Sequence, residues 1–314
     1  SLTLAITTAA PSNAGTWCSV VKISYFKGGN SDSFSDILEK GARQAAADTG
    51  ANVTIISSNW DFPLMVQKFK EEIAKKPDAI SFMGHPGDAA IMPTVKSAKD
   101  AGILVDFSNV PAPKSIAALN SGFVGANLLK MGNLLAARSI KDFGLKKGDQ
   151  ALVMGAFGVP GRSDREDGVV ATLQKAGLKV IKLDLKSAGD IAGNPSLLTP
   201  LFVANMKKYP KLKYINASGP TLGAMKIYFD AAGIKPGAIK VSGFDLGATV
   251  LQSFADGYVQ ISADQEPFKQ GYMPVLSLCM AKVYGLSPSS VDTSSGFVTV
   301  DNYKTVAALP VGFR

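Results

Sequence analysis

The sequence alternates between short apolar runs rich in β-branched residues and longer stretches with helical periodicity. The apolar runs lie at residues 20–25, 52–57, 79–83, 103–107, 151–154, 179–183, 214–216 and 239–242. Runs of this kind are typical of strands. Apolar residues between them recur at helical spacing, as at Val169, Leu173 and Ala176, which predicts amphipathic helices. Because parallel strands need a crossover helix to return the chain, the alternation predicts parallel sheets covered by helices on both faces.

This alternation is interrupted once. It breaks at residues 120–127, after a Pro-rich loop at 111–113, and starts again at Gln150. The length of 314 residues is about twice that of a common domain. We therefore expect two similar α/β units.

Glycines and one aspartate mark expected helix ends. Gly50, Gly102, Gly177 and Gly233 each follow an amphipathic run, the position typical of a helix C-terminus. Asp61 stands before Phe62-Pro63, which predicts an N-cap with proline in the first turn.

Composition excludes several classes of protein. Hydrophobic residues make up 46% and charged residues 18% of the chain, as in folded globular proteins. The net charge of +8 is modest, and the lysines are scattered instead of forming a basic run with aromatics, so we expect no nucleic-acid partner. No apolar run reaches the roughly 18 residues that span a bilayer.

The start of the chain and its two cysteines bear on its compartment. The chain begins Ser1-Leu2-Thr3, without an initiator Met or a basic and apolar leader, so we expect a processed or trimmed chain, and the missing leader does not exclude secretion. Cys18 and Cys279 are too few for a disulfide scaffold. We expect two buried thiols, with a bridge between them as the alternative.

The first expected strand leads into a polar loop. Residues 27–34 read Lys-Gly-Gly-Asn-Ser-Asp-Ser-Phe, and in open α/β sheets ligands bind at the carboxyl ends of the strands. Asp32 could accept hydrogen bonds from hydroxyls and Phe34 could stack on a sugar. The alternatives are a helix cap for Asp32 and core packing for Phe34.

Catalytic and cofactor motifs are missing from the sequence. Gly28-Gly29 fits neither a GxGxxG nor a GxxxxGK[ST] pattern, so no nucleotide cofactor is expected. His85 is the only histidine, which is too few for a metal cluster, and no GxSxG elbow occurs. We expect no enzyme and no metal; His85 is either a wall of a binding site or a structural residue.

Acidic and basic residues follow strands in the second half. Asp245 stands directly after the run at 239–242 and offers two oxygens to vicinal hydroxyls, with an N-cap as the alternative. Arg162 and Arg165 follow an earlier strand. We expect one of them to face ligand and the other to pair with a nearby acid such as Glu166 or Asp167.

Three motifs in this order resemble a known family. They are Asp32-Ser33-Phe34, Gly243-Phe244-Asp245 and the QxPxxQG pattern of residues 265–271. Over almost the whole chain the sequence resembles periplasmic sugar-binding proteins of the ribose, galactose and xylose type. The resemblance implies an α/β fold of two Rossmann-like lobes with parallel sheets joined by three crossovers, the type I periplasmic binding protein fold.

The resemblance also implies discontinuous lobes. The N-terminal lobe would hold residues 1–125 and 265–292, and the C-terminal lobe residues 126–264 and 293–314. A sugar would be trapped between them as the hinge closes.

Site residues carry over one by one from the family pattern. Asp32 and Phe34 look like first-loop ligands and Asn109 like the polar residue after the fourth strand. Asn127 and Gln265 look like the hinge asparagine and glutamine. The remaining ligand-binding residues are His85, Arg162 as the arginine clamp, and Asp245 as the main acid of the second lobe.

The implied function is capture of a monosaccharide or sugar alcohol outside the cytoplasm and its delivery, by a monomer, to the permease of an ABC importer. Asn109-Val110 replaces the Asp-Arg pair of ribose-type members, and Gly219 replaces an asparagine, so another pentose, a ketohexose or a polyol is as compatible as ribose. The alternative function is the effector-binding domain of a lactose-repressor-type transcription regulator. A Rossmann-type sugar enzyme is the third possibility, without a cofactor fingerprint.

Overall fold

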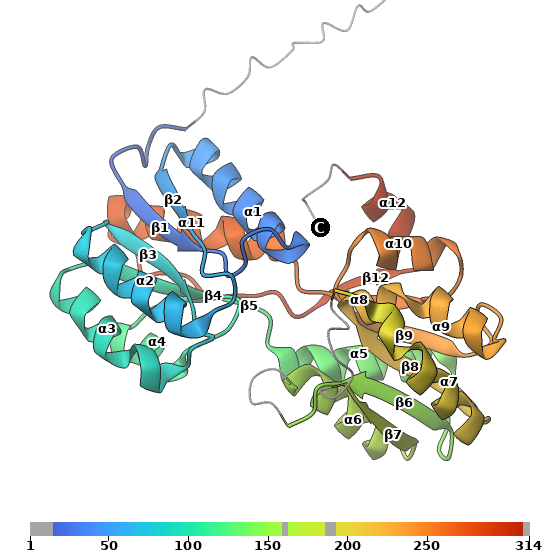
Figure 1. Ribbon diagram of the computed structural model, residues 1–314. Coiled ribbons are helices and arrows are strands. Elements are labelled where there is room, and N and C mark those ends of the chain that lie inside the picture. The colour runs from blue at the N-terminus through green and yellow to red at the C-terminus, as the bar shows by residue number, and fades with distance from the viewer. Residues whose placement is uncertain (1–14, 159–162, 186–192, 310–314) are drawn as a thin grey trace, which may run out of the picture. The chain divides into compact units, whose positions relative to one another are not determined.

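A computed structural model describes residues 15–158, 163–185 and 193–309. The chain forms two compact units (Figure 1). The first takes the chain up to Val124 together with Pro267–Val291, and the second takes Gly125–Glu266 together with the chain from Asp292 onward. The backbone therefore passes from one unit to the other three times.

The first unit is a parallel α/β layer structure. Its elements are β1 (Lys22–Phe26), α1 (Ser33–Thr49), β2 (Asn52–Ile56), α2 (Phe62–Ala74), β3 (Ala79–Met83), α3 (Asp88–Asp100), β4 (Leu104–Ser108), α4 (Pro113–Leu119), β5 (Phe123–Gly125), α11 (Pro267–Tyr284) and β11 (Val291–Asp292). The strand order is β11-β5-β4-β3-β1-β2. Pairing is parallel from β2 through β1, β3 and β4 to β5. All five residues of β3 are buried, as expected for a strand covered on both faces.

Helix α11 returns to the first unit and packs along α1. Two glycines allow this close approach. A Cβ atom on Gly41 would collide with the carbonyl oxygen of Phe268, and one on Gly271 would collide with that of Leu38. The glycine of the QxPxxQG motif is therefore needed for helix packing, since no larger residue fits there.

The second unit repeats the plan with one antiparallel strand. Its elements are α5 (Leu128–Phe143), β6 (Gln150–Gly155), α6 (Asp164–Lys175), β7 (Lys179–Asp184), the 3₁₀ helix η1 (Pro195–Leu198), α7 (Thr199–Lys208), β8 (Leu212–Ser218), α8 (Gly219–Gly223), α9 (Met225–Ala232), β9 (Lys240–Phe244), α10 (Ala248–Ala255), β10 (Ile261–Asp264), β12 (Gly296–Thr299) and α12 (Tyr303–Ala307). The strand order is β12-β10-β9-β8-β6-β7. Only β12 runs antiparallel, beside β10, among the described strand pairs of this sheet.

Both faces of the second sheet are buried under helices. Ala151 and Val153 of β6 join a core with α5 and α6, whereas Leu152 and Met154 join a core with α7, α9 and α10. Side chains of a strand alternate between the two faces of a sheet, so the two cores lie on opposite faces. The predicted sheets of mainly parallel strands, covered by helices on both faces, are confirmed, and all eight apolar runs form strands.

The expected helix ends are also confirmed. Asp61 caps α2, its carboxylate accepting a hydrogen bond from the backbone N–H of Leu64 at 2.9 Å. Gly50 and Gly233 end α1 and α9 in the left-handed conformation. No helix within the described residues is long and apolar enough to cross a membrane.

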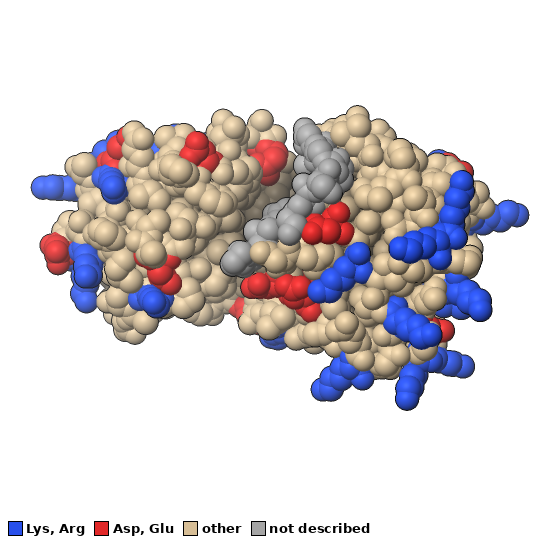
Figure 2. Space-filling view, turned by 60° about the horizontal axis from the view of Figure 1, so that its bottom comes forward, with Lys and Arg blue, Asp and Glu red and all other residues tan. Residues whose placement is uncertain are grey.

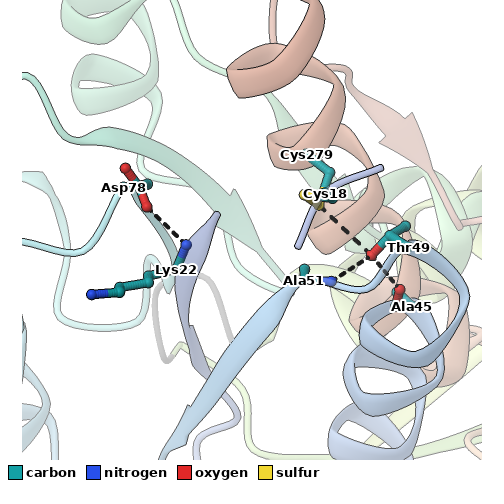
Figure 3. Close-up of a disulfide and its surroundings, with 7 residues drawn as sticks. All are labelled: Cys18, Lys22, Ala45, Thr49, Ala51, Asp78 and Cys279. Carbon is teal, nitrogen blue, oxygen red and sulfur yellow. Dashed lines mark hydrogen bonds between the residues drawn. A yellow bond between two sulfur atoms is a disulfide. The ribbon is translucent and has the colours of Figure 1, made fainter. Parts of the chain in front are cut away.

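The expectation of two separate buried thiols is wrong. Cys18, just before β1, and Cys279, in α11, form a disulfide with their Cα atoms 5.8 Å apart (Figure 3). The two residues are 261 positions apart, and the packing of α11 against α1 brings them together. Thr49, at the end of α1, lies beside the bridge, its Oγ1 3.8 Å from the Cys279 sulfur.

Candidate functional site

Asp245 is the centre of a polar network at the carboxyl end of β9. One carboxylate oxygen accepts a hydrogen bond from Arg165 at 2.9 Å, and the other accepts one from the side-chain amide of Gln265 at 2.8 Å. The Ser262 hydroxyl donates to the Asp245 carbonyl at 2.6 Å. With φ of 70°, the Asp245 backbone occupies the left-handed region that few non-glycine residues adopt. These contacts fix the orientation of a carboxylate that is 26% exposed.

Arg165 is the buried cation of this network. It is buried, lies 3.0 Å from the Glu166 carboxylate and has its guanidinium 5.0 Å from the centre of the Phe244 ring. Burial alone would lower the pKa of Arg165, but the charges of Asp245 and Glu166 outweigh it and raise that pKa above its ordinary value. Arg165 therefore stays cationic, and it is the arginine that pairs with an acid. Arg162, the expected clamp, lies outside the described residues.

Gln265 and Gly219 flank the same carboxylate. Gln265 follows β10 and is partly exposed. Gly219 follows β8 with φ of 51°, and a Cβ atom there would lie 4.0 Å from the nearer carboxylate oxygen of Asp245. Gly219 thus borders Asp245 and leaves space beside that carboxylate.

Asp32 in the first unit acts as a helix cap. One carboxylate oxygen accepts a hydrogen bond from the Ser35 backbone N–H at 2.9 Å, and the other accepts from the Ser35 hydroxyl at 2.8 Å. The indole Nε1 of Trp60 donates to the same second oxygen at 2.9 Å. The sequence allowed Asp32 to be a ligand-binding acceptor or a helix cap, and these contacts are those of a helix cap. Asp32 nevertheless remains exposed.

Phe34 and His85 are both partly buried. Phe34 packs against the core of the first unit, as its structural interpretation predicts. His85 follows β3 and lies beside two aromatic rings, with centroid distances of 5.3 Å to Trp60 and 5.5 Å to Phe62. Asp32, Trp60 and His85 thus come from loops after three neighbouring strands, β1, β2 and β3.

The two asparagines have distinct local roles. Asn109, after β4, is buried, and its amide donates to the side-chain oxygen of Gln270 in α11 at 3.0 Å. Asn127 is exposed and caps α5, accepting from the Lys130 backbone N–H at 3.0 Å. Its own backbone N–H donates to the Ser294 hydroxyl at 3.0 Å.

Sequence reasoning missed Trp60 and the partners of the polar residues. Trp60 comes four residues after the end of β2, so the rule that ligands bind at the carboxyl ends of strands would have found it. The Arg165–Asp245 pair joins positions 80 residues apart, and no local pattern announces it.

The residues that the structure describes include no set of side chains that could bind a metal ion. No three His, Cys, Asp or Glu side chains converge there to hold an ion. Both cysteines belong to the disulfide. The arrangement at both sheets, carboxylates and amides beside aromatic rings, suits hydrogen bonding to a neutral hydroxylated ligand.

Comparisons with known proteins find similar sequences and structures. The model of the periplasmic binding protein domain matches residues 24–282. The xylose/arabinose-binding protein of Sulfolobus acidocaldarius is 24% identical over 262 residues, which are 78% of this chain and 62% of that protein. The chain thus spans less than two thirds of that relative. The D-ribose/D-allose-binding protein of Pseudomonas aeruginosa is 26% identical over 242 residues, 74% of this chain and 73% of that one.

A solved structure shares the fold. The solute-binding protein of an ABC transporter from Burkholderia graminis, determined with D-arabinose, has a TM-score of 0.75 and 23% identity. The match covers 91% of this chain and 97% of that chain. At this level of identity the likeness establishes the type I fold, in agreement with the architecture predicted from the sequence.

Proposed function

Because this chain belongs to the periplasmic binding protein domain family, we propose that it is an extracytoplasmic solute-binding protein that captures a small carbohydrate for a membrane importer. The observation that carries the proposal is the oriented carboxylate of Asp245, held by Arg165 and Gln265 at the carboxyl end of the sheet. The names of the relatives support a pentose or hexose as ligand. They favour this function over the effector domain of a transcription regulator.

We propose ligand-binding side chains in each of the two units. In the second unit we propose Asp245, Gln265, Asn127 and Arg162. Asp245 presents an acceptor for sugar hydroxyls while Gln265 keeps it in place. A carboxylate that already has two partners retains further lone pairs for a ligand.

The first unit contributes fewer charges. We propose His85, Asn109, Phe34 and Asp32 as its site residues. The amide of Asn109 is fixed by Gln270, and Asp32 is fixed by Ser35. These residues therefore shape the site with little loss of side-chain entropy on binding.

Transport, with no chemical change to the sugar, is the rest of the proposal. A single chain would bind one sugar and present it to the permease of an ABC importer. Family members bind substrates without catalysis, so recovered sugar should have its original mass and configuration.

Thermal unfolding with a panel of sugars tests this function. The panel holds D-xylose, L-arabinose, D-arabinose, D-ribose, D-allose and myo-inositol. A ligand at about 1,000 times its dissociation constant adds about 4 kcal/mol to the free energy of unfolding. We expect at least one member to raise the melting temperature by several degrees. If none does so at millimolar concentration, the proposed function is wrong.

A further inference from the structure

Trp60 stands in a strained turn after β2. Asn59 and Trp60 are consecutive non-glycine residues with φ of 52° and 61°. A bulky residue rarely adopts the left-handed region, which costs about 1–3 kcal/mol and persists where surrounding contacts enforce it. Here the backbone N–H groups of Ser58 and Trp60 both donate to the carbonyl oxygen of Gly28, at 3.0 and 3.3 Å.

The indole ring lies on the glycine loop after β1. A Cβ atom on Gly28 would lie within 2.9 Å of three adjacent carbons of the Trp60 ring, a geometry that places Gly28 over the ring face. A Cβ atom on Gly29 would lie 2.5 Å from the indole nitrogen. The Gly28-Gly29 pair, which fits no phosphate-binding motif, is thus explained by the seat that it forms for Trp60.

Hydrogen bonding fixes the ring within its plane. Nε1 of Trp60 donates to the Asp32 carboxylate at 2.9 Å, and Ser35 holds that carboxylate from the other side. Trp60 is nevertheless only partly buried. The strained turn, the glycine loop and the hydrogen bond to Asp32 therefore hold a large aromatic ring in one orientation at the carboxyl ends of the strands. A ring fixed in this way is suited to contact a ligand.

The surroundings of Trp60 are aromatic. His85 lies 5.3 Å from its ring, and beyond His85 lies Phe62, which is 41% exposed. Asp32, the acid of this corner, already has three hydrogen-bond donors. This part of the first unit therefore offers apolar ring surface more than charge.

We propose that Trp60 is the aromatic wall of the ligand site and that Asp32 is its positioning residue. The inference rests on the proposed sugar-binding function and narrows the ligand to cyclic sugars. A pyranose ring fixes several C–H groups on one face, which can lie against an aromatic ring. An open-chain polyol has no such fixed face and loses more conformational entropy when it binds. The site thus favours an aldose ring over the polyol of the same carbon chain.

The chain allows a direct optical test. It contains two tryptophans, and Trp17 stacks on Tyr284 at the start of the first unit, with ring centroids 5.3 Å apart. Trp17→Phe leaves Trp60 as the only indole. We expect a cyclic aldose identified by calorimetry to change the emission of Trp17→Phe over the same concentration range as it releases heat. The matching polyol should bind at least about tenfold more weakly.

Substitutions at Trp60 complete the test, with Phe143→Leu as the matched control, because Phe143 is a partly buried aromatic residue at the end of α5 that packs on the core of the second unit. Trp60→Leu should bind the aldose at least about tenfold more weakly, while Phe143→Leu should change affinity by less than about threefold. Trp60→Phe retains an aromatic face and should keep most of the affinity if the leucine variant folds poorly. Asp32→Asn should shift the Trp60 emission without sugar.

Two failures are distinguishable. If sugars bind by calorimetry but neither the emission of Trp17→Phe nor the affinity of Trp60→Leu and Trp60→Phe changes, the inference about Trp60 is wrong and the proposed function stands. If no sugar gives heat with the unsubstituted protein, the proposed function fails, and the inference fails with it.

Discussion

The two units share a sheet order and a parallel architecture but fix their polar residues by different means. In the first unit, Asp32 is held by neutral donors, a serine and an indole. In the second, Asp245 is held by a buried arginine that also pairs with Glu166. One fold thus supports an aromatic corner in one unit and a charged network in the other, because the loops after the strands vary while the packed layers do not.

Charge follows the same division. Of the 33 basic and 25 acidic residues, 20 and 14 lie in the second unit, so it carries +6 of the net charge of +8. Figure 2 shows Lys and Arg side chains gathered on the visible face of that unit. The first unit is close to neutral and instead has a disulfide that links the segment before β1 to α11. Its stability should depend less on salt than that of the second unit.

The largest expected effect comes from the buried arginine. Arg165→Met removes the partner of two acids and should lower the free energy of unfolding by about 3–5 kcal/mol, because a buried charge left alone is costly. Arg138→Met is the control, since Arg138 makes an exposed pair with Asp142 and should cost less than about 1 kcal/mol. Denaturant unfolding of both variants measures the difference. Equal losses would show that burial of the network contributes nothing.

The disulfide should have the next largest effect. Replacing both cysteines by serine, or reducing them, should lower the free energy of unfolding by about 2–4 kcal/mol, because the bridge restricts the unfolded chain. Melting with and without reductant measures this loss, and the double variant, which has no bridge to reduce, is the control. A reductant effect that persists in the double variant would contradict the assignment.

A buried acid in the first unit should make the free energy of unfolding depend on pH, with a smaller effect than the two substitutions above. Asp106 lies in the middle of β4, fully buried and opposite Ser81 of β3. Burial raises the pKa of Asp106 well above its usual range, although the Ser81 hydroxyl partly lowers it. The folded protein thus keeps this proton where the unfolded chain, with a pKa of about 3.9, releases it.

The sign of the effect follows from proton linkage. Stabilisation by Asp106 is complete below about pH 4 and decreases as the pH rises toward the raised folded pKa. Asp106→Asn cannot ionise, so it should lose less stability than the unsubstituted protein between pH 4 and pH 8. Denaturant unfolding across this range measures the two slopes, with the exposed Asp100→Asn as control. Parallel slopes for all three proteins would contradict a buried, protonated Asp106.

The strands that sequence could predict are those with continuous apolar runs. All eight expected runs form strands because a sheet covered on both faces requires apolar side chains in both directions. Four of the described strands, β5, β10, β11 and β12, lie outside these runs. β10 reads Ile-Ser-Ala-Asp, and its polar residues Ser262 and Asp264 are both buried. A buried strand is identified in a sequence by a continuous apolar run, and these two polar residues interrupt that run.

The candidate site was predictable by position more than by contact. Looking at the carboxyl ends of the expected strands singled out Asp32, His85 and Asp245 as candidates, and the family resemblance added Asn109. The same rule could not show which of them are held by other side chains, since those partners lie far away in the sequence. Gln270, for instance, is 161 residues from Asn109. Pairing of this kind is decided by the packing of whole elements, here α11 against the first sheet.

The central claim is that the Asp245 network binds sugar, and titration calorimetry tests it most directly. The sugar from the panel that stabilises the protein most should bind one molecule per chain. Asp245→Asn should weaken binding at least about tenfold, because a charged acceptor of hydroxyls is lost, while the exposed Asp301→Asn should bind as the unsubstituted protein does. Equal affinity in all three proteins would contradict the claim.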